Sequence, residues 1–183
     1  MPPTTALLRL EYAREPDVSS QLDRELRELI SDCFDQPHDA FFRERRYAQE
    51  MPMHRFMLRS EGGSLVAHLA VHEKRIAVAG TELQVGGMAE ACVHRSQRRQ
   101  GHLRRLLQHA HEQLVERGIA YALLLGDPAL YASSGYLPLD ASVRRFNHNT
   151  QGFEDSELPA ALYKPLTERP WPPGPVDLRG PLF

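Results

Sequence analysis

Five arginines fall within eleven residues of this sequence, at a point where an apolar strand pattern changes to a helical one. They are Arg95, Arg98, Arg99, Arg104 and Arg105. The first turn of a helix has unpaired N–H groups and the positive end of the helix dipole, and arginines add forked bonds to phosphate oxygens. Gly101 would let the backbone approach a phosphate without a Cβ in the way. The junction therefore predicts a site for a diphosphate-bearing ligand, with a solvated basic helix start as the alternative.

The basic character of this junction is local, because the whole chain of 183 residues carries a net charge of −2. No global positive field favours nucleic acid or an acidic membrane as a partner, and no apolar run has the length of a membrane span. Cys33 and Cys92 are the only cysteines and lack metal-ligand spacing. We therefore expect a cytoplasmic protein with no metal site, and the length predicts a single domain over residues 1–183.

Hydrophobic periodicity predicts an α/β chain with a core of about 7–147 and a tail of about 150–183 packed on it. Helices are expected from a cap at Ser19 or Ser20 to Cys33, over Asp39–Gln49, over 101–117, and after Asp127-Pro128. Strands are expected near 7–12 and at His54–Ser60, Ser64–Arg75, Thr81–Val93, Tyr121–Leu125, Ser142–Asn147 and Ala161–Leu166. Ala79-Gly80 is the expected hairpin tip.

Two segments carry a family resemblance. Val93-His94, then Arg98-x-x-Gly101-x-Leu103 and an apolar helix, resembles the acetyl-CoA motif of the GNAT superfamily (general-control-related N-acetyltransferases). Leu103 departs from the small residue usual there, as it does in the mycobacterial "enhanced intracellular survival" type. Residues 125–136 (LGDPALYASSGY) are similar to the family's late motif. The resemblance covers roughly 20–140, with distant similarity to aminoglycoside 2'-N-acetyltransferases and rhizobial nodulation N-acyltransferases.

The resemblance implies both a fold and a ligand. The GNAT fold has a central mixed, mostly antiparallel sheet, flanked by helices and splayed here between Thr81–Val93 and Tyr121–Leu125 to admit CoA. Acetyl-CoA would be the acyl-donor cosubstrate, with its pantetheine arm along the backbone of Ala91 and Val93. Its pyrophosphate would be held by Arg98, Arg99, Gln100, Gly101, His102, Leu103 and Arg104.

Two residues are candidates for proton transfer. The phenol of Tyr131, with an ordinary pKa of about 10, can hold a proton at neutral pH and pass it to a thiolate. The resemblance places the general acid at this tyrosine, and packing is the alternative. Glu90 stands among small and apolar residues, so burial would raise its pKa towards that of a useful base. A regular strand would point Glu90 away from the face of Val93, so this role requires a bulge. Pairing with an arginine is the other reading.

These residues predict direct transfer of an acetyl group from acetyl-CoA to a primary amine of a small molecule or peptide. Two alternatives stay open: an enzyme with a longer acyl donor, which the nodulation-like tail favours, and a GNAT module that binds acyl-CoA without catalysis. Four acidic residues either attract a cationic acceptor or solvate a helix face: Asp32, Asp35, Asp39 and Glu44. The sequence leaves the acceptor open, and also the oligomeric state, a homodimer included.

Overall fold

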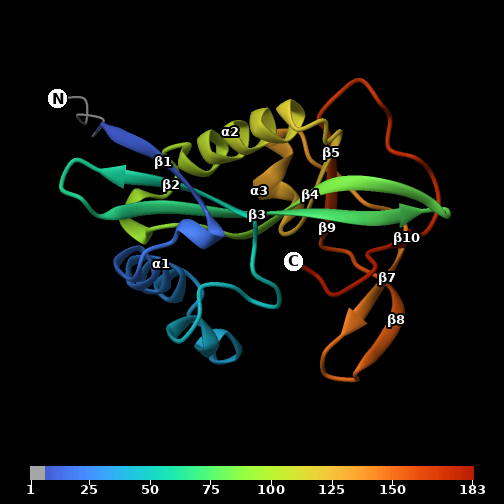
Figure 1. Cartoon of the computed structure of the whole chain (residues 1–183). Coiled ribbons are helices and arrows are strands. Elements are labelled where there is room, and N and C mark those ends of the chain that lie inside the picture. Colours follow the sequence, from blue (N-terminus) through green and yellow to red (C-terminus); the bar gives the residue numbers. More distant parts are fainter. Residues whose placement is uncertain (1–6) are drawn as a thin grey trace. The chain divides into compact units, whose positions relative to one another are not determined.

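The structure divides into two units. Three elements contribute residues to both units: the strands β3 (Leu65–Val78) and β4 (Thr81–Val93) and the helix α2 (His102–Glu116), which are labelled in Figure 1. The computed structural model describes residues 7–183. The first unit contains residues 1–70 and 90–109, and the second contains residues 71–89 and 110–183. A single domain over the whole chain stays a prediction.

The first unit pairs a short sheet with a capped amphipathic helix. Strand β1 (Leu8–Arg14) lies antiparallel to β2 (His54–Ser60), and β2 pairs with β3. Helix α1 (Ser20–Cys33) begins as predicted, because the Ser19 side chain accepts a hydrogen bond from the Leu22 N–H at 3.2 Å. Its buried face consists of Leu26, Leu29 and Ile30. The serine cap and the spacing of apolar residues together located this helix correctly.

The segment between α1 and β2 differs from its prediction. A helix was expected over Asp39–Gln49, whereas the structure has the 3-10 helix η2 (Pro37–Arg43) followed by turns and bends. Phe42 is buried and anchors η2, and a second 3-10 helix, η1 (Glu15–Asp17), follows β1. The Ala48 N–H donates to the carboxylate of Glu90 instead of a helical carbonyl. A tertiary hydrogen bond thus replaces the helical one.

The second unit is built on a mixed sheet with the order β6-β9-β5-β4-β3-β10-β7-β8. The bounds are β5 (Tyr121–Leu125), β6 (Leu137–Pro138), β7 (Ser142–Asn147), β8 (Gly152–Glu157), β9 (Ala161–Pro165) and β10 (Val176–Asp177). β4 and β5 are parallel over three residue pairs, as are β10 and β7, while β5–β9, β6–β9, β7–β8 and β10–β3 are antiparallel. The predicted mixed, mostly antiparallel sheet is confirmed.

The C-terminal part of the chain holds more strand than the sequence predicted. β7 and β9 were expected, whereas the two-residue strands β6 and β10 and the longer β8 were not. β8 reads GFEDSE, with half-buried and exposed residues alternating, so few apolar side chains mark it. β10 is two residues long and joins β3 to β7. Backbone pairing, which leaves little trace in composition, holds both strands in place.

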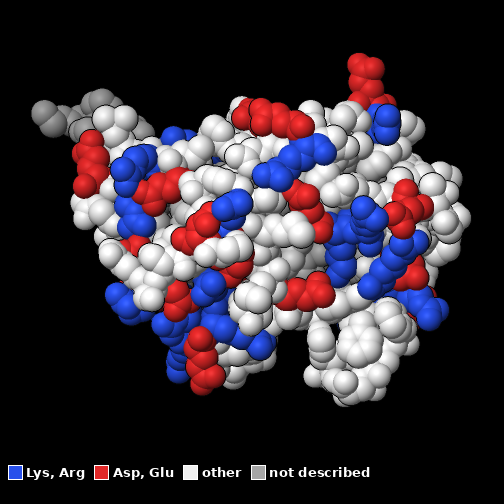
Figure 2. Space-filling view, in the orientation of Figure 1, with Lys and Arg blue, Asp and Glu red and all other residues white. Residues whose placement is uncertain are grey.

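The chain forms two short helices after β5. The short helix α3 (Pro128–Tyr131) is capped by Asp127, as predicted, and runs into η4 (Ala132–Ser134). No helix within residues 7–183 is both long and apolar enough to cross a bilayer. On the face shown in Figure 2, basic and acidic side chains are interspersed.

Candidate functional site

Glu90, near the end of β4, has a backbone conformation that a regular strand does not contain. Its φ is +43°, in the left-handed region that residues other than glycine seldom adopt. The regular alternation of side chains is therefore interrupted at this residue. Glu90 is buried, the next residue Ala91 is half-buried, Cys92 is buried and Val93 is half-buried. The strand irregularity that a catalytic role for Glu90 required is present.

The carboxylate of Glu90 is held at one oxygen only. The Ala48 N–H donates to Oε1 at 3.0 Å, and Oε2 has no hydrogen-bond partner among the described residues. Burial raises the pKa of Glu90 to about 7, against the opposing effects of the Ala48 N–H and the Arg55 charge. A carboxylate with that pKa and one uncommitted oxygen is able to take up a proton near neutral pH.

The loop between β4 and α2 ends in backbone amides that the helix does not use. It contains the 3-10 helix η3 (Arg95–Gln97), and two of its later residues are left-handed: Arg99 has a φ of +64° and Gly101 a φ of +77°. The first helical bond of α2 joins the Arg105 N–H to the Gly101 carbonyl at 3.0 Å. The N–H groups of residues 102–104 precede that bond and have no partner within the helix, so they are available to an anion.

Gly101 has a backbone conformation that favours glycine. A Cβ built on Gly101 has no atom of the described residues within 4 Å, so no neighbouring protein atom excludes a side chain there, and clearance for a bound phosphate stays a prediction. The left-handed φ is the constraint, because an L-residue pays a steric cost there. The backbone shape of the loop therefore depends on this glycine.

The five arginines of the junction have separate roles. Arg95 holds the loop to the end of α1, donating to the Asp32 carbonyl at 2.7 Å and to the Asp35 carboxylate at 2.8 Å. Arg105 donates to the Leu8 carbonyl, and Arg98 donates to the Val93 carbonyl at 3.2 Å. The other two, Arg99 and Arg104, are exposed and form no hydrogen bond or ion pair with any described residue. These two cations are free to meet an anionic ligand.

The remaining residues of the expected CoA site are close to this loop in sequence and belong to the same unit. Gln100 is exposed, Leu103 is half-buried, and His102 is buried, with no partner for Nε2 among residues 7–183. Burial, with a smaller effect from Arg105, lowers the pKa of His102. The Val93 carbonyl also accepts from the Cys33 thiol at 3.4 Å, so both of its lone pairs are in use. A pantetheine amide pairing there would have to displace one donor.

Tyr131 lies in the second unit, at the end of α3. It is 7% exposed, and its ring meets that of Tyr136 edge-on with centroids 5.8 Å apart. A Cβ built on Gly126 would lie 2.5 Å from Cε2 of Tyr131, so the ring sits directly on that glycine. The Tyr136 hydroxyl is 2.8 Å from Nε2 of His111. Packing accounts for the ring of Tyr131, and its catalytic role stays a prediction.

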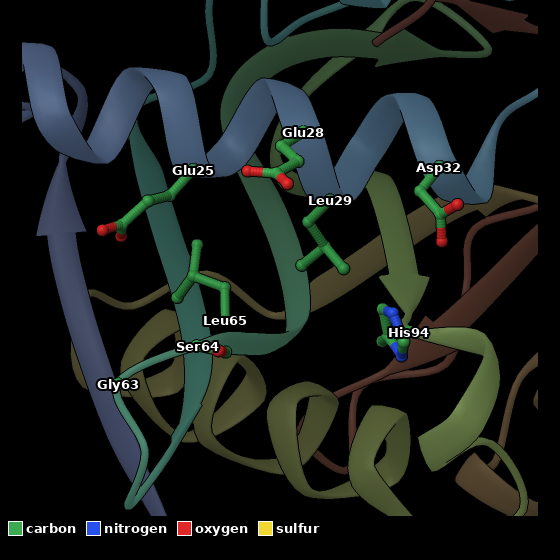
Figure 3. A pocket seen from close by; sticks show the side chains of 8 residues that line it. All are labelled: Glu25, Glu28, Leu29, Asp32, Gly63, Ser64, Leu65 and His94. Carbon is green, nitrogen blue, oxygen red and sulfur yellow. The ribbon is translucent and has the colours of Figure 1, made fainter.

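A cavity of about 470 Å³ in the first unit is lined on one side by acidic residues of α1 (Figure 3). Glu25, Glu28 and Asp32 come from α1, and His94 comes from the end of β4. Glu25 is paired with Arg59 at 2.8 Å, so part of this negative charge is compensated. Asp32, expected to attract a cation or to solvate its helix, lines this cavity. No group of three metal-ligating side chains lies together within residues 7–183.

Sequence reasoning missed two polar residues beside Glu90. Nδ1 of His68 is 3.0 Å from the Glu90 carbonyl, and Nε2 of His68 is 3.1 Å from the Arg55 guanidinium. Both side chains are fully buried, at 0% exposure. The sequence carried a signal for His68, which interrupts the otherwise apolar residues 65–71 (LVAHLAV), whereas Arg55 follows another polar residue at the start of β2 (HRFMLRS) and carried none. A polar residue inside an apolar strand needs a partner.

Comparisons with known proteins give a family match and a set of similar folds. A family model described as an acetyltransferase (GNAT) domain matches residues 19–139. A search of proteins with curated descriptions found no significant match. A GNAT family N-acetyltransferase (YhbS) from Escherichia coli, solved in complex with CoA, is 24% identical with a TM-score of 0.63, covering 94% of this chain and 89% of that one.

Two further solved structures share the fold at lower identity. A GNAT family acetyltransferase from Brucella melitensis in complex with acetyl-CoA is 19% identical with a TM-score of 0.52, covering 70% of this chain and 83% of that one. Eis1 from Mycobacterium abscessus is 13% identical with a TM-score of 0.59, covering 75% of this chain but only 33% of that one. At these identities the likeness establishes the fold.

Proposed function

Because the chain belongs to the GNAT acetyltransferase family, we propose that it is an acyl-CoA-dependent N-acyltransferase that transfers an acetyl group from acetyl-CoA to a primary amine. The acceptor would be a small molecule or a peptide. The observation that carries the proposal is Glu90: a buried carboxylate with a pKa of about 7 and an oxygen that no described residue occupies. A structural glutamate in a hydrophobic core would ordinarily have both oxygens satisfied.

The CoA diphosphate would bind the loop between β4 and α2. The N–H groups of residues 102–104, the left-handed residues Arg99 and Gly101 and the unpaired guanidinium groups of Arg99 and Arg104 support this assignment. The pantetheine arm would run beside Ala91 and Val93, with Gln100, His102 and Leu103 shaping the loop. The proposed site therefore combines backbone donors with two exposed positive charges.

The proposed mechanism assigns two proton transfers to protein side chains. One removes a proton from the acceptor ammonium before acyl transfer, and the other delivers a proton to the leaving CoA thiolate. Oε2 of Glu90 takes a proton from the acceptor ammonium, directly or through one water, which leaves a neutral amine. The amine nitrogen then bonds to the thioester carbonyl carbon, the carbon–sulfur bond breaks, and CoA leaves as a thiolate. We propose that Tyr131 donates its phenolic proton to that thiolate, on the strength of the late motif. The nitrogen of the addition product loses its second proton, which returns through solvent to the Tyr131 oxygen and restores the phenol, while Glu90 releases its proton to solvent. The products are an amide and free CoA.

The experiment that tests this function is release of free thiol from a panel of acyl-CoAs of rising chain length, with primary amines as acceptors. Tyr131→Phe should lower kcat, because the thiolate loses its proton donor while the ring keeps its packing. Preference for a long acyl chain would replace the acetyl assignment. No thiol release from either the wild type or the variant, with CoA still bound, would favour the alternative of a binding module.

A further inference from the structure

Two fully buried polar side chains are linked by hydrogen bonds to the backbone of Glu90. Arg55 on β2 and His68 on β3 each have 0% of their surface exposed. A buried guanidinium is costly unless it is paired and fully hydrogen-bonded. The Glu15 carboxylate accepts from Nε of Arg55 at 2.5 Å, and the Arg46 carbonyl accepts from Nη2 at 3.2 Å. The positive charge is therefore matched, and its remaining nitrogen, Nη1, points to His68.

The hydrogen bonds define the protonation state of His68. Arg55 has donors only, so Nε2 of His68 must accept at 3.1 Å and carries no proton. The Glu90 carbonyl has acceptors only, so Nδ1 of His68 must donate at 3.0 Å. His68 is therefore neutral with its proton on Nδ1. Burial, followed by the Arg55 charge, lowers the pKa of His68 well below its usual range, in agreement.

Glu90 is therefore held both at its backbone carbonyl and at its side-chain carboxylate. The left-handed φ of +43° is sterically unfavourable for a residue with a side chain, so other contacts must maintain it. His68 fixes the backbone carbonyl, and the Ala48 N–H fixes Oε1. Without these two contacts the backbone of Glu90 would relax to an extended conformation, and its side chain would rotate towards the opposite face of the strand.

We propose that His68 and Arg55 are positioning residues for Glu90: Arg55 fixes the tautomer of His68, and the Nδ1–H of His68 holds Glu90 in the left-handed conformation that places its carboxylate. This inference rests on the proposed role of Glu90 as the base. His68 itself takes no part in proton transfer. Its only function in the reaction is to keep the backbone of the base in place.

The surroundings of Glu90 allow a positional effect to be separated from an electrostatic one. The titratable and charged groups that face it are Arg55 on β2, Glu15 on η1, His68 on β3 and Cys92 on its own strand. His68 is neutral, so replacing it with another neutral residue changes no charge near the carboxylate. A change in the titration of Glu90 in such a variant must then come from movement of the group.

Two amide replacements each preserve one half of the His68 contacts. In His68→Asn the amide nitrogen takes the place of Nδ1 and still donates to the Glu90 carbonyl. In His68→Gln the amide reaches the place of Nε2, accepts from Arg55 and leaves the Glu90 carbonyl without its donor. Both variants are neutral, polar and close to histidine in size. They differ in the one contact that the proposal requires.

The test measures kcat, the KM for acetyl-CoA, and the titration of Glu90 by carboxyl NMR of the full chain, assigned with Glu90→Gln. His68→Asn should keep the carboxyl pKa near 7 and retain most of kcat. His68→Gln should bring the pKa down towards about 4.3 as water reaches the carboxyl, and lower kcat about 10²-fold with KM unchanged. Arg55→Lys, which keeps the charge and the histidine, should behave like His68→Gln.

Equal behaviour of the Asn and Gln variants, or an unchanged Glu90 titration in both His68→Gln and Arg55→Lys, would overturn the positioning role. Full activity of Glu90→Gln would overturn the proposed base instead. In that case the NMR titration of the His68 variants still decides whether the network holds Glu90. The two failures are therefore distinguishable by a measurement that does not depend on turnover.

Discussion

The most direct test of the diphosphate loop is the change Gly101→Ala. The φ of Gly101 is +77°, and an added Cβ meets no described atom within 4 Å, so the substitution introduces backbone strain and no clash. Left-handed backbone costs about 1–2 kcal/mol for a residue with a Cβ. In the free protein the loop can escape this cost by relaxing, and CoA binding would then have to restore the left-handed shape.

The expected loss of binding follows from that cost. If the whole 1–2 kcal/mol appears in binding, the Kd for CoA rises about 5- to 30-fold, since 1.4 kcal/mol corresponds to a factor of ten. Isothermal titration calorimetry with CoA and with acetyl-CoA measures this directly. The melting temperature should change little, because the relaxed loop no longer stores the strain in the folded state.

Gly118 supplies a matched control. Its φ is +79°, a Cβ built on it also meets nothing within 4 Å, and it lies in the second unit just beyond the end of α2. Gly118→Ala should lower the melting temperature and leave the Kd for CoA unchanged. If Gly101→Ala bound CoA as tightly as the wild type, or if both variants lost affinity equally, the assignment of the diphosphate to this loop would be refuted.

Two further predictions concern Glu90. Its pKa is raised from 4.5 to about 7 in the folded state, so the wild type loses stability as the pH rises through that range. Glu90→Gln should therefore lose activity yet be more stable above pH 7, by up to about 3 kcal/mol (2.5 × 1.36), in denaturant titrations at pH 5 and pH 8. An identical pH dependence of stability in the two proteins would contradict this. Ala48→Pro removes the N–H that lowers the pKa of Glu90. The acidic limb of the kcat/KM profile should then move up by about one to two pH units. The control Ala48→Ser keeps the N–H and should leave the limb in place. If the limb moved in neither variant, the Ala48 N–H would not control the pKa of the catalytic base.

Much of the fold was predictable because local signals and tertiary packing agree. Ser19 caps α1, Asp127 caps α3, and the apolar stripe of α2 lies where its spacing placed it. The predictions fail where contacts between residues distant in the sequence determine the local structure. β8 has too few apolar residues to be read as a strand, and the peptide of Ala48 bonds to Glu90 instead of continuing a helix.

The candidate site likewise has one part that could be predicted from the sequence and another part that could not. The loop at 98–104 was predictable, because glycine and arginine at a helix start have a direct physical meaning. An irregularity of the strand at Glu90 was predictable only as a condition for its role, in the form of a bulge, and its left-handed conformation was not predicted. The contacts of Arg55 and His68 depend on strand pairing that brings residues 13 and 22 positions apart together, and no local pattern reports that.

The two unpaired guanidinium groups at the loop, Arg99 and Arg104, have a practical consequence for anyone who measures this protein in solution. Any small oxyanion in the buffer will compete for the same positive charges and backbone amides, if they hold a diphosphate as proposed. Phosphate or sulfate buffers would then raise the apparent Kd for CoA and mask the ligand-free behaviour of the protein. Titrations at constant ionic strength in a zwitterionic buffer whose amine is tertiary would avoid both this competition and acylation of the buffer.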